Sequence, residues 1–322
     1  MRKKVLIFGA LGQDGSFLSK FLFDKDYIIY GTTRGVNNSK LINHKKLNLI
    51  NKVNLINLEP KYKDNVYKLI KKLLPDEIYY LSGISSISES AKDPTNTVDS
   101  IILGTKNILD ACYNLKNKKK INIFFSGSTE CFGNLDFKKD KFSEQSPFFP
   151  KNTYSMAKSL SFYLVKNYRE NYSLDCCTGI LSNHESILRS NKYVSKKIVN
   201  GAKNIKRKKI KKLYLGNINI YRDWGWAPEY VSVFWKMLNS NTINDYIIAT
   251  GQTNSLKKFI RNVFLHYELD WKKYVVYSDK FERKNEIKYT SFNIDLICKK
   301  LNWKPSVTFN KIISKMINNE IY

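Results

Sequence analysis

Three glycines near the N-terminus constrain the fold of this chain more than any other sequence feature. They follow the apolar run of residues 4–8, which predicts a buried strand, and precede the amphipathic stretch of residues 16–24, which predicts a helix. In such a strand–turn–helix unit, Gly9 allows the tight turn, Gly12 lets the backbone approach a pyrophosphate, and Gly15 allows close packing of the helix on the strand. The helix N-terminus adds free N–H groups for that phosphate. The segment therefore predicts a dinucleotide site.

Strands and helices alternate through the rest of the first half of the chain. Short apolar runs predict the strands, and apolar residues at helical spacing predict the helices between them. The expected strands are residues 27–31, 53–58, 77–81, 121–125 and 175–181, and the expected helices are residues 64–74, 97–115 and 154–172. This alternation is typical of βαβ units. We therefore expect an α/β fold with a Rossmann-like, doubly wound parallel sheet.

The regular alternation ends near residue 182, which indicates a second structural unit. Beyond this point Asn, Lys and aromatic residues mix with short expected strands, residues 212–215 and 246–250. We expect a dinucleotide-binding Rossmann domain over residues 1–181, completed by part of residues 222–250. Residues 182–322 are expected to form mainly a smaller C-terminal lobe that binds the substrate.

The charge of the chain raises a separate possibility. Its 322 residues carry a formal net charge of +27, which is compatible with nucleic-acid binding. However, lysine is spread along the whole chain and far outnumbers arginine, the residue better suited to reading bases. A diffusely basic surface is therefore the preferred interpretation, and a basic nucleic-acid-binding protein on a Rossmann scaffold is the alternative.

Cysteine and histidine usage restricts the other function classes. The five cysteines show no Cys-x-x-Cys spacing, and the three histidines are scattered, so we expect no metal site. An odd number of cysteines without a secretion signal indicates a reducing, cytoplasmic setting. No apolar run approaches the length of a membrane-spanning helix, so we expect a soluble protein without a membrane partner.

The end of the second expected strand bears on the choice of dinucleotide. An acidic residue that would bind a free ribose 2′-hydroxyl is absent there, and the sequence instead reads Thr32-Thr33-Arg34. An arginine at this place suits a 2′-phosphate, so NADP is favoured over NAD. The alternative is that Arg34 is only a surface residue of a basic protein.

A tyrosine and a lysine at the start of the helix over residues 154–172 form a candidate catalytic pair. Tyr154 and Lys158 are four residues apart and share one helical face. A nearby ammonium lowers the pKa of a tyrosine, which makes phenolate accessible near neutral pH. Ser128 and Glu130 follow the strand over residues 121–125, at the sheet edge where open α/β folds place ligands. The hydroxyl can bind a sugar oxygen, and the carboxylate adds a second acid or base.

Taken together, these motifs resemble the extended short-chain dehydrogenase/reductases that act on nucleotide sugars. Within that group the chain is most similar to the GDP-mannose 4,6-dehydratase family, and the resemblance covers nearly the whole chain. More specific than the general motifs are the segments Asn183-His-Glu-Ser186 and Arg222-Asp-Trp-Gly225. Further matching segments are residues 12–16, 147–158, 179–186 and 248–251.

The resemblance implies an internal redox cycle that returns the cofactor unchanged. Tyr154, assisted by Lys158, would remove the proton of the C4 hydroxyl while hydride passes to NADP⁺, and Ser128 would orient the same oxygen. Glu130 would then remove the proton at C5 and help water leave from C6 before hydride returns there. The product would be a 4-keto-6-deoxy sugar.

The same resemblance assigns binding residues to both ligands. The implied cofactor contacts are Gly9, Gly12, Gln13, Asp14, Gly15, Arg34, Leu81, Tyr154 and Lys158. The implied substrate contacts are Thr129, Asn183, Lys197, Arg222, Arg283 and Glu286. GDP-mannose or a close relative such as a GDP-heptose would be the substrate, and a homodimer or homotetramer is expected. A 4-epimerase or 4-keto reductase of the same fold is the main alternative, although Glu130 and the segment Asn183-His-Glu-Ser186 argue against it.

Overall fold

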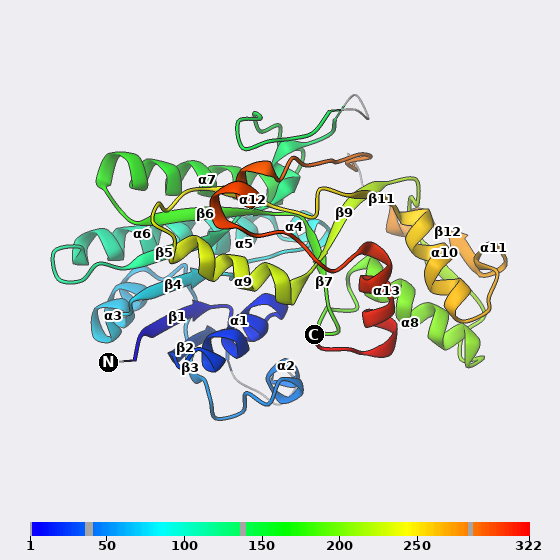
Figure 1. Ribbon diagram of the computed structural model, residues 1–322, viewed down its shortest axis with the longest axis horizontal. Helices are drawn as coiled ribbons and strands as arrows, with labels where there is room; N and C mark the ends of the chain where they lie inside the picture. Colours follow the sequence, from blue (N-terminus) through cyan, green and yellow to red (C-terminus); the bar gives the residue numbers. More distant parts are fainter. Residues whose placement is uncertain (1, 36–40, 136–139, 283–285) are drawn as a thin grey trace.

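The computed structural model describes residues 2–35, 41–135, 140–282 and 286–322, and its central element is a seven-stranded parallel sheet (Figure 1). From one edge to the other its strands are β10 (Tyr246–Ile248), β6 (Cys176–Leu181), β5 (Asn122–Ser126), β4 (Glu77–Tyr80), β1 (Lys4–Phe8), β2 (Ile28–Thr33) and β3 (Asn54–Asn57). The order of β3, β2, β1, β4, β5 and β6 is that of a dinucleotide-binding fold. The expected Rossmann-like sheet is therefore confirmed.

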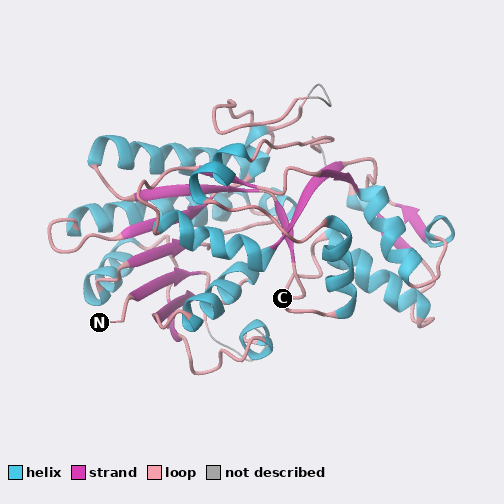
Figure 2. Cartoon of the chain, in the orientation of Figure 1, coloured by secondary structure: helices cyan, strands magenta, loops and turns pink. Residues whose placement is uncertain are grey.

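Helices cover both faces of this sheet, as Figure 2 shows. One face carries α1 (Gln13–Asp24), α9 (Ala227–Leu238) and α12 (Asp295–Leu301), and the other carries α3 (Lys63–Leu73), α6 (Gly104–Leu115) and α7 (Thr153–Tyr172). In β1, Val5 and Ile7 pack toward the first group, whereas Leu6 and Phe8 pack toward the second. Successive side chains of a strand point to opposite faces, so a sheet covered on both sides requires such an unbroken apolar run.

The helix expected over residues 97–115 is interrupted in the structure. It consists of α5 (Pro94–Val98), the π-helical segment η1 (Asp99–Leu103) and α6. The Tyr80 hydroxyl donates a hydrogen bond to the carbonyl oxygen of Ser100 within η1, and a Cβ atom at Gly104 would lie 2.0 Å from the same hydroxyl. The wider π turn and the missing side chain therefore accommodate Tyr80.

The C-terminal part of the chain forms a second core beside the sheet. Here α8 (Val194–Lys206), α10 (Leu256–His266) and α13 (Phe309–Asn318) pack around Trp224 and Trp226. The remaining elements are β7 (Asn183–Glu185), β8 (Leu213–Leu215), β9 (Tyr221–Trp226), β11 (Thr253–Ser255), β12 (Val275–Tyr277), α2 (Ile42–Lys46), α4 (Ile87–Lys92), α11 (Trp271–Tyr274), η2 (Thr129–Phe132) and η3 (Asp279–Phe281). Strand β9 pairs with β7 on one side and with β11 on the other, and β8 pairs with β12. After β9 the chain returns to the main sheet through α9 and β10.

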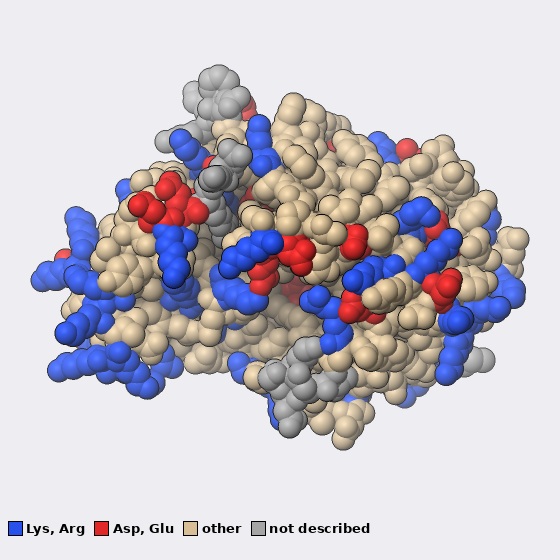
Figure 3. Space-filling model, turned by 180° about the vertical axis from the view of Figure 1, so that it is seen from behind, with Lys and Arg blue, Asp and Glu red and all other residues tan. Residues whose placement is uncertain are grey.

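Basic side chains are spread across the surface. On the face shown in Figure 3, Lys and Arg side chains are distributed over the molecule with Asp and Glu side chains among them. Among the described residues, no helix is both long enough and apolar enough to cross a membrane.

Candidate active site

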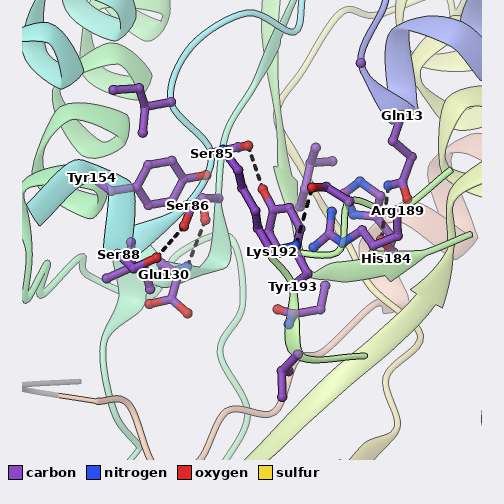
Figure 4. A pocket seen from close by; sticks show the side chains of 18 of the residues that line it. Gln13, Ser85, Ser86, Ser88, Glu130, Tyr154, His184, Arg189, Lys192 and Tyr193 are labelled. Carbon is purple, nitrogen blue, oxygen red and sulfur yellow. Dashed lines mark hydrogen bonds between the residues drawn. The ribbon is translucent and has the colours of Figure 1, made fainter. Parts of the chain in front are cut away.

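A cleft of about 860 Å³ lies between the carboxyl ends of the sheet strands and the C-terminal lobe (Figure 4). It brings together candidate residues that are far apart in the sequence. Those that line it are Gly9, Gly12, Gln13, Asp14, Gly15, Arg34, Leu81, Ser128, Thr129, Glu130, Tyr154, Lys158, Asn183, Lys197, Arg222 and Glu286. Arg283, the remaining candidate, lies outside the described residues.

The glycine turn has the shape that a pyrophosphate site requires. A Cβ atom at Gly15 would lie 2.2 Å from the carbonyl oxygen of Gly9, so α1 can begin at this place only without a side chain. Gly9 itself has a φ of +86°, and a Cβ atom there would crowd the backbone of Leu81 at 3.1 Å. Gly12 precedes α1, and no side chain caps the helix. The first N–H groups of α1 therefore face the cleft, and these residues fit a dinucleotide.

The residues that follow β2 and β4 line the part of the cleft next to the glycine turn. Arg34 is exposed at the end of β2 and lines the cleft. The next residue, Gly35, donates its N–H to Oδ1 of Asn57 at the end of β3, at 2.8 Å. On the other side of β1, Leu81 continues β4 and its N–H donates to the carbonyl oxygen of Phe8 at 3.0 Å. The strand ends thus place one cation and one apolar side chain beside the glycine turn.

Tyr154 and Lys158 enter the cleft from the first turns of α7. A capping box fixes the start of this helix: Oδ1 of Asn152 accepts the N–H of Ser155, and Oγ of Ser155 accepts the N–H of Asn152. Lys158 Nζ lies 6.0 Å from the centroid of the Tyr154 ring. The same Nζ donates to the carbonyl oxygen of Ser126, at the end of β5, at 2.6 Å. The pair expected from the sequence is therefore present and held by β5.

The electrostatics of this pair differ from the sequence-based expectation. Burial raises the pKa of Tyr154, and a hydrogen bond with the Ser128 side chain lowers it by less. Burial also lowers the pKa of Lys158 to about 8, while the Asp14 carboxylate acts in the opposite direction. In the ligand-free protein burial therefore has the larger effect on the pKa of Tyr154, and the ammonium is directed to the carbonyl oxygen of Ser126.

Ser128, Thr129 and Glu130, in the turn after β5, have different surroundings. Ser128 precedes η2, and its Oγ accepts the N–H of Glu130 at 3.2 Å. The Thr129 hydroxyl donates to the carbonyl oxygen of Leu181 at 3.1 Å, so it holds the turn in place. The Glu130 side chain is half-buried and lies on the same side of the cleft as Tyr154 (Figure 4). The turn thus presents a hydroxyl and a carboxylate beside the tyrosine.

The substrate-side candidates come from β7, β9 and α8. Asn183 and Arg222 lie on the paired strands β7 and β9, and Arg222 is buried, with Nη1 donating to the carbonyl oxygen of Tyr221 at 2.9 Å. Lys197 Nζ donates to the carbonyl oxygen of Tyr214 at 2.7 Å and lies 3.3 Å from the centroid of the Phe281 ring. These cations line the lobe side of the cleft together with Glu286.

Asp223 connects two of the matching sequence segments, residues 222–225 and 248–251. Its buried carboxylate accepts hydrogen bonds from the N–H of Thr250, the Thr250 hydroxyl at 2.8 Å and the N–H of Gln252 at 3.1 Å. Burial raises the pKa of Asp223 to about 6. The carboxylate therefore connects β9 to the turn after β10 and fixes the strand that carries Arg222.

A contact across the cleft was not anticipated from the sequence. Ser85, which follows β4, lies with its Oγ 2.6 Å from the Tyr193 hydroxyl, which precedes α8. The Arg189 guanidinium stacks 3.5 Å from the centroid of the Tyr193 ring, and Lys192 pairs with Glu89 of α4. These residues carry no periodic or motif signal of their own. The one sequence signal that could have pointed to this contact is the position of Arg189, just after the segment Asn183-His-Glu-Ser186.

The buried lysine should lower the stability of the fold. Because its pKa falls from 10.5 to about 8, Lys158 destabilises the folded state while charged in both states, and this cost disappears as pH rises from about 8 to 10.5. One pKa unit corresponds to about 1.4 kcal/mol, so the fall from 10.5 to about 8 corresponds to about 3.5 kcal/mol. Loss of the hydrogen bond to the carbonyl oxygen of Ser126 offsets about 1.5 kcal/mol, so we expect Lys158→Met to raise the free energy of unfolding at pH 7 by about 2 kcal/mol. Urea denaturation at pH 7 and at pH 10 measures this gain, which should shrink at the higher pH.

The exposed Lys106→Met substitution on α6 is the matched control, with an expected change within about 0.5 kcal/mol. A Lys158→Met protein that is no more stable than the wild type at pH 7 would contradict the expected cost.

Comparison with known proteins identifies the relatives of this chain. The family described as GDP-mannose 4,6 dehydratase matches residues 6–316. GDP-mannose 4,6 dehydratase 1 of Arabidopsis thaliana is 33% identical over an alignment covering 99% of this chain and 90% of that protein. GDP-mannose 4,6-dehydratase of Vibrio cholerae is 32% identical, covering 100% of this chain and 94% of that protein.

A solved structure with the same fold is dTDP-glucose 4,6-dehydratase of Bacillus anthracis in complex with NAD. It is 18% identical and superposes with a TM-score of 0.84 over 98% of this chain and 96% of that one. The sequence matches extend over nearly the full length, beyond the general dinucleotide-binding fold. The chain therefore belongs to the GDP-mannose 4,6 dehydratase family, whose members are nucleotide-sugar hydro-lyases.

Proposed function

We propose that this protein converts GDP-mannose into the GDP-linked 4-keto-6-deoxy sugar and water, with NADP as the cofactor. The observation that carries this proposal is the convergence of Tyr154, Lys158 and Glu130 on one cleft with the glycine turn of α1. GDP-mannose is preferred to a GDP-heptose because the relatives described above are named for GDP-mannose.

The residues of the cleft divide the reaction between them. When bound, a nicotinamide dinucleotide supplies a hydride acceptor and afterwards a hydride donor. Tyr154 removes the proton of the C4 hydroxyl, and Ser128 orients that oxygen. Burial raises the pKa of Tyr154 in the ligand-free protein, and the Lys158 ammonium, 6.0 Å from the ring centroid, acts against this effect by stabilising negative charge on the phenolate as the proton leaves. Glu130 removes the proton at C5 and donates it to the hydroxyl that departs from C6 as water. When hydride returns to C6, a proton is delivered to C5, and the proton taken up by Tyr154 balances it.

Glu130 separates this proposal from epimerisation or simple reduction. Those reactions need acid–base chemistry only at C4, which Tyr154 can supply. Elimination of water across C5 and C6 needs a second group that both accepts and donates a proton. A half-buried carboxylate on the tyrosine side of the cleft is suited to that role (Figure 4).

A small-molecule substrate is also favoured over nucleic acid. The basic side chains on the face in Figure 3 are spread out, whereas Arg222 and Lys197 converge on an enclosed cleft suited to a diphosphate. A cytoplasmic location is proposed as well, because the five cysteines, Cys112, Cys131, Cys176, Cys177 and Cys298, are free thiols.

Mass spectrometry of purified protein with NADP⁺ and a panel of GDP-, UDP- and dTDP-sugars tests the proposed reaction. We expect GDP-mannose alone to yield a product lighter by one water, with no net formation of NADPH. Tyr154→Phe should reduce turnover by about 10²–10⁴-fold, because it removes the general base. Glu130→Gln should allow oxidation at C4 but block elimination, so reduced nicotinamide accumulates in a single turnover.

Tyr172→Phe and Glu170→Gln, at outward positions of the same helix, are the matched controls and should retain full activity. Normal turnover in the Tyr154 and Glu130 variants would refute the assignment. Net consumption of NADPH, or a product of unchanged mass, would favour the reductase or the epimerase.

Cofactor preference is tested at Arg34. A hydrogen bond to a charged group contributes about 1.5–3 kcal/mol, so Arg34→Ala should weaken NADPH binding about 10–100-fold and leave NADH binding nearly unchanged. Fluorescence titration measures both affinities. Arg261→Ala on the exposed side of α10 is the control. Equal losses for NADPH and NADH would contradict recognition of the 2′-phosphate.

We further propose a homodimer formed through α7. Met156, Leu160 and Tyr163 lie at helical spacing on this helix and are 47–56% exposed, beside the exposed Val98 of α5 and Leu103 of η1. An apolar patch of this kind commonly marks a protein interface. Leu160→Lys should convert the dimer to a monomer in sedimentation analysis, whereas Leu265→Lys, at an exposed position of α10, should not. A wild-type protein that is monomeric at micromolar concentration would overturn the proposal.

A further inference from the structure

A buried histidine connects the glycine turn to the substrate-side strand β7. His184 is only 7% exposed. Its Nε2 lies 2.9 Å from Oδ2 of Asp14, in the first turn of α1, and its Nδ1 lies 2.7 Å from the carbonyl oxygen of Ser182. A carbonyl oxygen can only accept, so Nδ1 carries a proton. The lowered pKa of Asp14 keeps its carboxyl group ionised, so Nε2 carries the second proton and the pair is an imidazolium and a carboxylate.

The directions of the two pKa shifts agree with this charge state. The Asp14 carboxylate raises the pKa of His184 against the opposing effect of burial. The imidazolium in turn lowers the pKa of Asp14, again against burial. Each group therefore keeps the other charged inside the protein.

The Gln13 side chain extends the same connection. Its Nε2 donates to Oδ1 of Asp14 at 3.0 Å and to the carbonyl oxygen of His184 at 3.2 Å. Its Oε1 accepts the Ser186 hydroxyl at 2.8 Å. Gln13 and His184 lie together on the side of the cleft opposite Tyr154 (Figure 4). The first turn of α1 and the strand that carries Asn183 are thus held as one unit.

The position of Asp14 creates an electrostatic conflict that this unit resolves. A carboxylate in the first turn of a helix is favourable by itself. Here, however, the same turn faces the place where the glycine geometry admits a pyrophosphate, and two anions so close together repel one another. An imidazolium bound to the carboxylate cancels its charge without occupying the cleft.

We propose that His184 and Asp14 are a positioning pair, in which the imidazolium neutralises the carboxylate so that the start of α1 can hold the dinucleotide pyrophosphate, while β7 is fixed for the nucleotide sugar. This inference rests on the proposed function, which places the dinucleotide at α1 and the nucleotide sugar at β7. It predicts that the two ligands bind cooperatively, because ordering either element orders the other.

The decisive test is a double-mutant cycle on NADPH affinity, measured by fluorescence titration without turnover. His184→Gln leaves the carboxylate charged and should weaken NADPH binding at least tenfold. Asp14→Asn removes the charge and should bind NADPH at least tenfold more tightly than His184→Gln does. The double variant should recover to within about threefold of Asp14→Asn. A pair that served only to stabilise the fold would give the opposite order, with the double variant weakest, and that result would overturn the proposal.

Cooperativity provides a second readout. In the wild type, GDP should bind several-fold more tightly with NADPH present than without it, and His184→Gln should abolish that difference. Both are binding measurements, so they do not depend on catalysis. Wild-type protein that binds NADPH and GDP but leaves GDP-mannose unchanged would refute the proposed function, and the order of the NADPH affinities would still decide the role of the pair.

The pH profile covers the case in which His184→Gln does not fold. NADPH affinity of the wild type should fall as pH rises through the raised pKa of His184, because loss of the imidazolium exposes the Asp14 charge. In Asp14→Asn this decrease should be absent. The other titratable or charged groups around the ring and its partner are Arg189, Glu185, Tyr230, Asp223 and Lys158. Lys158 also titrates near pH 8, and Asp14 raises its pKa, so both profiles are compared in a Lys158→Met background. There the difference between the profiles reports the pair, and identical profiles would overturn the proposal.

Discussion

The close contact between β1 and α1 is the constraint on which the rest of the site depends. With 2.2 Å between a Cβ atom at residue 15 and the carbonyl oxygen of Gly9, only glycine lets the helix begin where the strand ends. The N-terminus of α1 consequently opens into the cleft at the carboxyl edge of the sheet. The turns after β4, β5 and β6 end at the same edge because the strands are parallel. Residues from distant segments can therefore surround one ligand.

The parts of the fold that sequence analysis predicted are those specified locally. The strand at residues 4–8 and the start of α7 follow from apolar runs, and the pairing of Tyr154 with Lys158 follows from helical spacing. The cleft also contains every described candidate, since motif residues at strand ends converge by topology. By contrast, the contact between Ser85 and Tyr193 joins side chains 108 residues apart that have no periodic signal.

Helices that the sequence analysis did not anticipate show a second limit. The α9 segment was missed although Tyr230, Phe234 and Met237 recur at helical spacing and are buried, because the irregular sequence on either side of it hid the pattern. The π-helical turn at η1 was also invisible, since it depends on Tyr80 of a neighbouring strand. The raised pKa of Tyr154 has the same origin. Spacing places an ammonium nearby, but only the folded structure shows its burial and its bond to Ser126.

The carboxylates of Asp14 and Glu130 show how different surroundings give the same functional group different roles. Asp14 is held by an imidazolium and an amide, so its charge is cancelled and its oxygens are already occupied. Glu130 stands on a short turn whose neighbours Ser128 and Thr129 bind backbone groups, and its own side chain remains partly open to the cleft. A carboxylate that must exchange protons needs such access, whereas one beside a phosphate needs neutralisation. The structure supplies each condition at the place where the proposed chemistry requires it.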